Sequence, residues 1–110
     1  MTSLALLLAT LAFLGLSATG AIAQSAAPIG YWTTDDNGEQ LLVQANAQCS
    51  FAAGGVTQVA GNCDWNSTSG GGILSIWYPT VGGPAAVRYN IVWIDQGTIS
   101  VFGDVFHRRQ

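Results

Sequence analysis

Residues 49–63 read CSFAAGGVTQVAGNC, and this stretch decides the fold. A Gly54-Gly55 pair lies near its middle, with β-branched and aromatic residues on both sides, which is typical of two strands joined by a tight turn. The pattern predicts strands near residues 47–53 and 57–66. We therefore expect a β-hairpin here, and we expect the rest of the chain to extend it.

A hairpin that turns at these glycines places Cys49 opposite Cys63. The same register pairs Phe51 with Gly61, so that an aromatic ring can cover a bare glycine across the strands. Trp65 falls on the same face as Cys63, because side chains two residues apart in a strand share a face. We expect a bridge between the cysteines to pin the two strands together.

The first 23 residues have the layout of a cleaved secretory signal peptide. Residues 4–16 form an uncharged apolar run, and Ala21-Ile22-Ala23 offers small residues where signal peptidase inspects the chain, so we expect cleavage after Ala23. One departure is that residues 1–3 contain no Lys or Arg. The alternative is an uncleaved membrane anchor, because residues 4–22 are nearly long enough to span a bilayer. We expect a secreted or periplasmic protein.

An oxidising compartment makes a Cys49–Cys63 disulfide the expected state of the two cysteines. A closed loop of about fifteen residues would stabilise the fold by about 3 kcal/mol. A metal site is the alternative, but two thiols and one distant histidine, His107, do not supply four ligands at a usable spacing. We expect no metal and no cofactor.

The remaining sequence shows short β-branched and aromatic runs between breaks rich in Gly, Asn and Asp, and no helical period. Seven or eight strands joined by short loops predict an all-β antiparallel meander, closed as a β-barrel or folded as a two-sheet sandwich. We expect a flexible tail over residues 24–29 and a single domain over 30–110. Further strands are expected at 30–34, 40–44, 73–78, 87–94, 98–102 and 104–109.

Two expectations concern the later strands. The strand at 87–94 should be the longest, with Val92 and Ile94 buried on its second face. The Ser- and Gly-rich segment 67–72 should be a flexible loop, and Asn66-Ser67-Thr68 at its edge fits an N-glycosylation acceptor, which matters only in a eukaryotic secretory pathway.

The charges exclude several classes of partner. Six acidic side chains and three arginines give a net charge of −3. Nucleic acids and anionic membranes require a basic stripe, so neither is expected as a partner. The acidic cluster at 35–39 lacks the ligand spacing of a calcium loop and fits a solvated hairpin turn.

His107 is the only histidine, and it is the residue on which a catalytic prediction would depend. Catalysis would require a nucleophile and an orienting acid, which can come from anywhere in the fold. Asp104 lies three residues earlier, on the opposite face of a strand. No Gly-x-Ser-x-Gly motif is present. We therefore expect a surface histidine and no enzyme.

The aromatic side chains are expected mainly in the core, although some of them could line a ligand pocket or a sugar-binding face. The strand faces richest in aromatics carry Trp77, Tyr89 and Trp93. These three residues are our candidates for ligand binding.

Gly30-Tyr31-Trp32 opens the first expected strand, and Arg108 lies in the last. This pattern resembles the Gly-x-Trp signature of lipocalin-like (calycin) barrels, in which the Trp closes one barrel end and an Arg from the final strand packs over it. The resemblance implies structural roles for Gly30, Trp32 and Arg108. The chain departs from a full lipocalin in being too short for the flanking helix.

The chain is also similar to bacterial inhibitors of secreted metalloproteases, which are shorter secreted barrels with two cysteines and a later Trp before a Leu-x-Ile-like strand. Leu74 and Ile76 would form that strand here, after Trp65 or Trp77, although the cysteine spacing is shorter than in that family. This resemblance implies an inhibitory tail at 24–29.

Together, these patterns predict an exported monomeric barrel that acts by binding and without catalysis. Its partner would be a small apolar ligand in the barrel or a protease docked by the tail. The alternative is a structural or envelope-associated surface protein.

Overall fold

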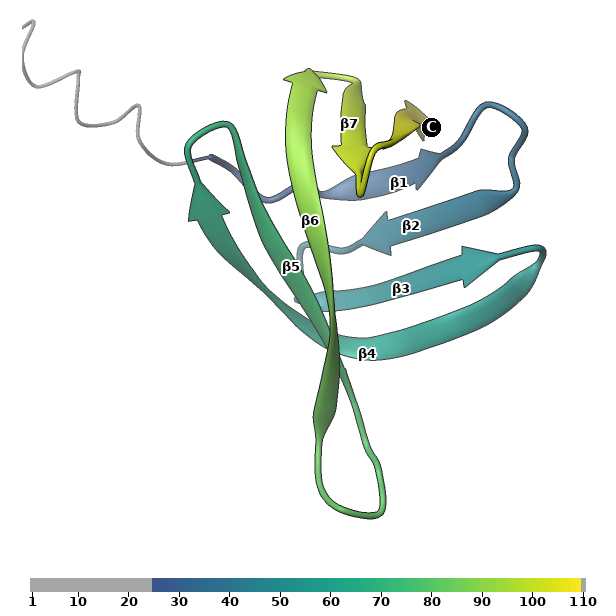
Figure 1. The fold of residues 1–110 in the computed structure, drawn as a ribbon, viewed down its shortest axis with the longest axis vertical. Helices are drawn as coiled ribbons and strands as arrows, with labels where there is room; N and C mark the ends of the chain where they lie inside the picture. Colours follow the sequence, from purple (N-terminus) through teal and green to yellow (C-terminus); the bar gives the residue numbers. More distant parts are fainter. Residues whose placement is uncertain (1–24, 110) are drawn as a thin grey trace, which may run out of the picture.

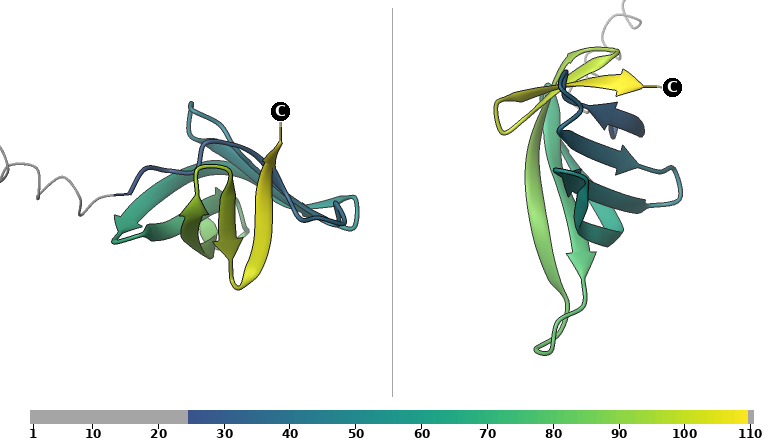
Figure 2. Two further views of the ribbon diagram at one scale, coloured as in Figure 1. Left: turned by 90° about the horizontal axis from the view of Figure 1, so that it is seen from above. Right: turned by 90° about the vertical axis from the view of Figure 1, so that its right-hand side faces the viewer.

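The computed structural model describes residues 25–109, and the expected signal peptide and its cleavage site lie outside the described residues. Each strand pairs antiparallel with the next, and the last pairs with the first, which closes a barrel (Figures 1 and 2). The all-β meander is thereby confirmed, as a barrel of eight strands. The strands are β1 (Gly30–Thr33), β2 (Glu39–Val43), β3 (Gln48–Ala53), β4 (Val56–Thr68), β5 (Gly71–Tyr78), β6 (Ala85–Asp95), β7 (Thr98–Val101) and β8 (Asp104–Arg109).

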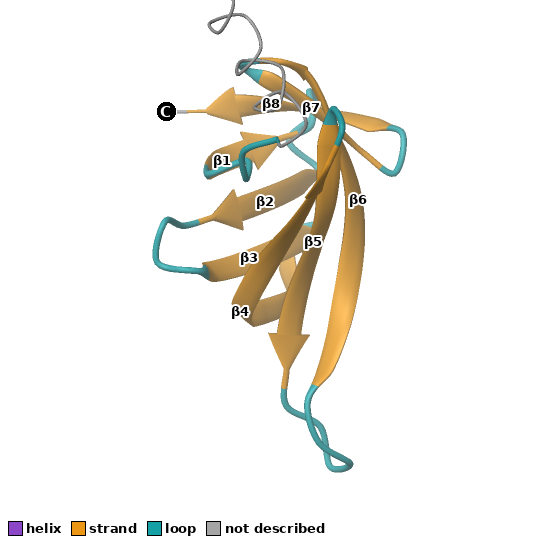
Figure 3. Ribbon diagram, turned by 90° about the vertical axis from the view of Figure 1, so that its left-hand side faces the viewer, coloured by secondary structure: helices purple, strands orange, loops and turns teal. Residues whose placement is uncertain are grey.

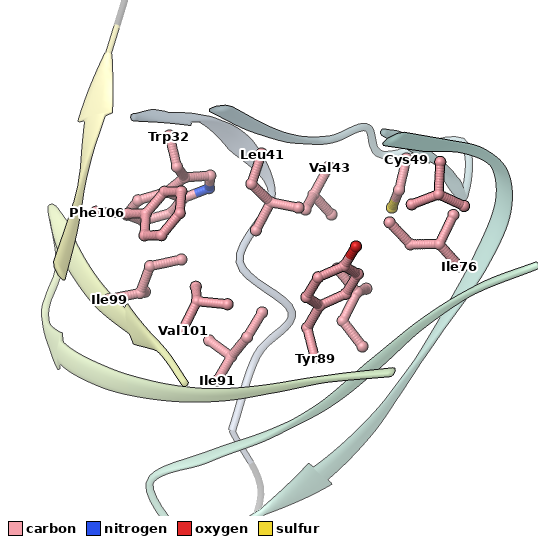
Figure 4. Packing of buried hydrophobic residues seen from close by; sticks show 12 residues of the cluster. Trp32, Leu41, Val43, Cys49, Ile76, Tyr89, Ile91, Ile99, Val101 and Phe106 are labelled. Atoms are coloured by element: carbon pink, nitrogen blue, oxygen red, sulfur yellow. The ribbon is translucent and has the colours of Figure 1, made fainter. Parts of the chain in front are cut away.

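The strands alternate between a face that points into the barrel and a face that points out, as the two-residue period of a strand requires. Within residues 25–109 there is no helix long and apolar enough to cross a membrane (Figure 3). Apolar side chains fill the interior, and burying each of the larger ones contributes about 1.5–3 kcal/mol (Figure 4). The buried cluster consists of Trp32, Leu41, Val43, Cys49, Val59, Leu74, Ile76, Tyr89, Ile91, Ile99, Val101 and Phe106.

The Cys49–Cys63 disulfide is confirmed, with 5.8 Å between the Cα atoms. The tight turn is also confirmed at Gly54 and Gly55, which take φ values of +62° and +79°. Two glycines with positive φ suit a two-residue hairpin loop.

The predicted register across this hairpin was wrong. Phe51 lies opposite Val59, and Cys49 lies opposite Gly61. The turn at Gly54 and Gly55 places Ala53 opposite Val56, and a register shift between Phe51 and Ala52 adds one residue of β4, which still leaves Cys49 two residues short of Cys63. Such a bulge adds one unpaired residue to one strand and moves every pair beyond it. The cysteines are consequently diagonal neighbours. The Phe51 ring packs against the Tyr89 ring, with 5.1 Å between the two ring centroids.

Strand β4 is the longest, with 13 residues, so the expectation for 87–94 was wrong. Its first half pairs with β3 and its second half, from Cys63, pairs with β5. The strand curves where it changes partner (Figure 1). Gly61 lies at this point, and a Cβ added there would overlap the backbone carbonyl oxygen of Trp77. Only glycine permits this close approach of β4 and β5.

Two other expectations were wrong, one about the segment 67–72 and one about the outer face of β6. The expected loop at 67–72 shrinks to a turn at Ser69-Gly70, because the β4–β5 ladder continues to the pair Thr68 and Gly71. Val92 and Ile94 are 49% and 53% exposed, because they lie on the outer face of β6. Alternation with Ile91 and Trp93 leaves both side chains about half exposed.

Candidate functional site

Residues 25–29 run across the barrel end that carries the β2–β3, β4–β5 and β6–β7 turns. Three tryptophans hold this segment in place, each through its indole N–H. The distances are 2.9 Å from Trp65 to the carbonyl oxygen of Ser25, 2.9 Å from Trp93 to that of Ala26, and 2.8 Å from Trp32 to that of Pro28. The segment that the sequence predicts as a flexible tail therefore lies against the barrel.

Arg108 completes this closed end. Its Cζ lies 4.3 Å from the centroid of the Trp32 ring, and its Nη1 donates a hydrogen bond of 2.6 Å to the carbonyl oxygen of Ile29. Gly30 has a φ of +143°, and a Cβ there would lie 2.6 Å from Nη1 of Arg108. The structure thus brings Gly30, Trp32 and Arg108 together at one barrel end.

The three predicted binding residues do not come together. Tyr89 lies in the core, where burial raises its pKa above the usual value of 10.0. Trp93 packs edge-on against Trp32, with 5.7 Å between centroids. Trp77 lies apart from both on the outer face of β5, and it is the one of the three that faces outward.

The outer face of β4, β5 and β6 around Trp77 is polar. Asp64, Ser75 and Arg88 are neighbours in one row across the three strands. The indole N–H of Trp77 donates to Oδ2 of Asp64 at 3.3 Å. The Cζ of Arg88 lies 5.9 Å from the Trp77 ring centroid. Below, we call this surface, with its exposed neighbours Asn62, Asn66 and Asn90, the Trp77 face.

Trp77 separates two grooves. The larger holds about 500 Å³ and the smaller about 310 Å³, sizes at the lower end of the roughly 300–1,000 Å³ of small-ligand sites. The larger is lined by Asp64, Trp65, Asn66, Ile73, Ser75, Trp77 and Arg88. The smaller is lined by Asn62, Trp77, Tyr78, Pro79, Thr80, Gly83 and Pro84.

Arg88 is the charged donor of the Trp77 face. Its side chain is exposed, and its guanidinium makes no hydrogen bond or ion pair with any other residue between 25 and 109. A guanidinium offers five N–H donors in a planar fork. These donors are therefore free for a ligand in the larger groove.

His107 has an acid and a hydroxyl as neighbours, which the sequence did not reveal. Its Nε2 lies 3.1 Å from Oδ1 of Asp35, and its Nδ1 lies 3.5 Å from Oγ1 of Thr98. The second distance is at the limit of a hydrogen bond. The Asp35 side chain is 86% exposed, and the groove that it lines includes neither His107 nor Thr98.

That groove, of about 660 Å³, is lined by acidic side chains from the β1–β2 turn, from β2 and from β8. Asp36 accepts hydrogen bonds from the backbone N–H of Gly38 at 2.9 Å and from the Thr34 hydroxyl at 2.8 Å, which hold its pKa below 3.8. Within the described range 25–109, no three His, Cys, Asp or Glu side chains are arranged to hold a metal ion. The carboxylates lining the groove are Asp35, Asp36, Glu39 and Asp104.

The fold and these sites define a class, a closed eight-stranded antiparallel barrel with an N-terminal segment docked across one end and a polar aromatic face on the outside. Comparison with known proteins finds no family model, no curated protein and no solved structure that matches the chain.

Proposed function

We propose that the protein is an exported, non-catalytic binding protein that holds its ligand on the Trp77 face. The observation that carries this proposal is the position of Trp77, which borders two grooves beside the Arg88 guanidinium, a group that makes no hydrogen bond or ion pair within residues 25–109. A surface indole flanked by charged and amide groups combines apolar contact area with hydrogen-bonding capacity, which small-ligand sites require.

The barrel interior supports this location over an internal site. Twelve apolar side chains are buried there and pack on one another (Figure 4). An apolar ligand in the barrel would have to displace some of them, at a cost of about 2–5 kcal/mol for each large side chain that loses its packing.

The absence of catalysis is part of the proposal. Asp35 and His107 form a contact that is largely exposed to water, and the third member, Thr98, is 3.5 Å from the ring nitrogen. Catalytic sets work in sites that exclude water, where charges interact strongly. The arrangement fits a surface contact between the β1–β2 turn and β8.

Export is supported by the disulfide, because such bonds persist in oxidising compartments. A tail-inhibitor role has less support, because the backbone carbonyls of residues 25–29 are engaged by Trp32, Trp65, Trp93 and Arg108. A surface protein without any ligand is the remaining alternative.

A capture experiment tests the proposal. The exported protein is immobilised and exposed to the soluble contents of its own compartment, in parallel with Trp77→Ala and with Tyr31→Ala, which removes an exposed aromatic from another strand. We expect a small-molecule species retained by the native protein and by Tyr31→Ala, lost with Trp77→Ala, and chemically unchanged after incubation. Retention of nothing, or equal retention by Trp77→Ala, would contradict the proposal.

A further inference from the structure

We infer that the ligand of the Trp77 face is a neutral oligosaccharide, with one pyranose ring stacked on Trp77 and its hydroxyl groups bonded to Asp64 and Arg88. This inference rests on the proposed function, since it specifies the ligand class of the same face.

The indole of Trp77 borders both grooves. Its N–H donates to Oδ2 of Asp64 at 3.3 Å and the Cζ of Arg88 lies 5.9 Å from its ring centroid, so a sugar would stack on the ring beside the guanidinium. A pyranose with equatorial hydroxyls presents flat faces of C–H groups, which match the large, electron-rich face of an indole. Because grooves continue from both edges of the ring, a chain of sugars crossing Trp77 finds space on either side.

The polar groups around the ring suit hydroxyls. A sugar hydroxyl donates one hydrogen bond and accepts others. Arg88 supplies only donors, Asp64 supplies acceptors, and the amide of Asn66 in the same groove supplies both. Hydrogen bonds from hydroxyls to charged groups are stronger than those between neutral groups.

The charges favour a neutral ligand. One carboxylate and one guanidinium flank Ser75 in the same row, so an anion would meet Asp64 and a cation would meet Arg88. An apolar ligand would strip water from both charges without replacing its hydrogen bonds, which is costly. A neutral polyhydroxylated chain satisfies both groups.

Calorimetric titration of the exported protein with neutral hexasaccharides tests the inference. Cellohexaose, xylohexaose and mannohexaose are the probes, with hexagalacturonate as an anionic comparison. We expect one or more neutral probes to bind at one site. Trp77→Ala should weaken that binding at least about tenfold, and Asp64→Asn or Arg88→Gln about tenfold each, the loss of one charged hydrogen bond.

Matched controls keep the test interpretable. Tyr31→Ala and Asp104→Asn make the same chemical changes away from the Trp77 face and should bind within about twofold of the native protein, a difference well under 1 kcal/mol. Trp77→Phe keeps a stacking ring, so it should fall between the native protein and Trp77→Ala. Circular dichroism verifies that each variant is folded.

The outcomes separate the inference from the proposed function. Failure of all neutral probes to bind, tighter binding of hexagalacturonate, or binding that survives Trp77→Ala would overturn the inference. If the capture experiment still yields a Trp77-dependent species without sugar, the proposed function stands and only the ligand class is wrong. If capture also shows no dependence on Trp77, both are wrong.

Discussion

The guanidinium of Arg108 lies over the indole of Trp32, with its Cζ 4.3 Å from the ring centroid, and joins the last strand to the first. The same side chain donates hydrogen bonds to the carbonyl oxygens of Ile29 and Gln96. It therefore links the N-terminal segment, the β6–β7 turn and the barrel seam. A cation over an aromatic face and a charged hydrogen bond each contribute about 1 kcal/mol or more.

Arg108→Met should lower the free energy of unfolding by about 1–2 kcal/mol, because both contributions are lost while the apolar stem is kept. Urea denaturation followed by tryptophan fluorescence measures this. Arg88→Met is the comparison, since Arg88 has a longer cation–π contact, 5.9 Å from the Trp77 ring centroid, and no hydrogen bond within the described chain, so it should change stability by only about 0.5 kcal/mol. Equal effects of the two variants would contradict the role given to Arg108.

The disulfide gives a second prediction. Replacing Cys49 and Cys63 together by Ala should lower the free energy of unfolding by about 3 kcal/mol, because the unfolded chain regains the freedom of a loop of about fifteen residues. Reductant should destabilise the native protein to a similar extent and leave the double variant unchanged. An unchanged urea midpoint in the variant would show that the bridge does not stabilise the fold.

The lowered pKa of Asp36 predicts that the free energy of unfolding falls at acidic pH. Hydrogen bonds from Gly38 and Thr34 lower its pKa below 3.8, so its ionised form is favoured by folding. The resulting stability is fully present above the unfolded pKa of about 3.9 and is lost as the pH falls through the lower folded pKa. Asp36→Asn should therefore flatten the decline of stability below about pH 4, measured by urea denaturation at stepped pH.

The control for this measurement is Asp104→Asn, a carboxyl in the same groove for which the structure shows no hydrogen bond among the described residues. That variant should retain the acid dependence of the native protein. An unchanged profile for Asp36→Asn would rule out Asp36 as a source of the dependence.

Gly61 is predicted to position Trp77. A Cβ at Gly61 would overlap the Trp77 carbonyl oxygen, so Gly61→Ala must push β5 away from β4, at a cost of about 1–3 kcal/mol. Gly82→Ala is the matched control, because a Cβ there meets nothing within 4 Å. Thermal unfolding should distinguish the two variants clearly. Equal melting temperatures would contradict the close approach of the strands.

The sequence was sufficient to predict the features that depend on residue spacing and backbone preference. The glycine turn at 54–55, the disulfide and the alternating inward face of β6 at Tyr89 and Ile91 follow from spacing and backbone preference. The number of short apolar runs predicted seven or eight strands, and it left a closed barrel and a two-sheet sandwich as alternatives.

The features that the sequence could not predict depend on distant parts of the chain. The bulge beside Phe51 shifts the β3–β4 register by one residue, and no residue preference marks it. The rest of the register error has a local cause, because a two-residue turn at Gly54-Gly55 places Ala53 opposite Val56. The contact of His107 with Asp35 requires β8 to pair with β1 across the barrel seam. The Trp77 face required knowledge of which residues on three strands become neighbours, although the outward position of Trp77 between Ile76 and Tyr78 was a usable signal.

A heteronuclear NMR titration tests the central claim, that the ligand is a neutral oligosaccharide bound on the Trp77 face, most directly. The protein has four tryptophans, of which Trp32, Trp65 and Trp93 bond to the N-terminal segment and Trp77 bonds to Asp64. On addition of the three neutral hexasaccharides in turn, the indole N–H signal of Trp77 should shift with one or more of them while the signals of Trp32 and Trp93, which line neither groove, stay in place. Shifts of the three segment-bound indoles with no change at Trp77, or no shift at all, would contradict the account.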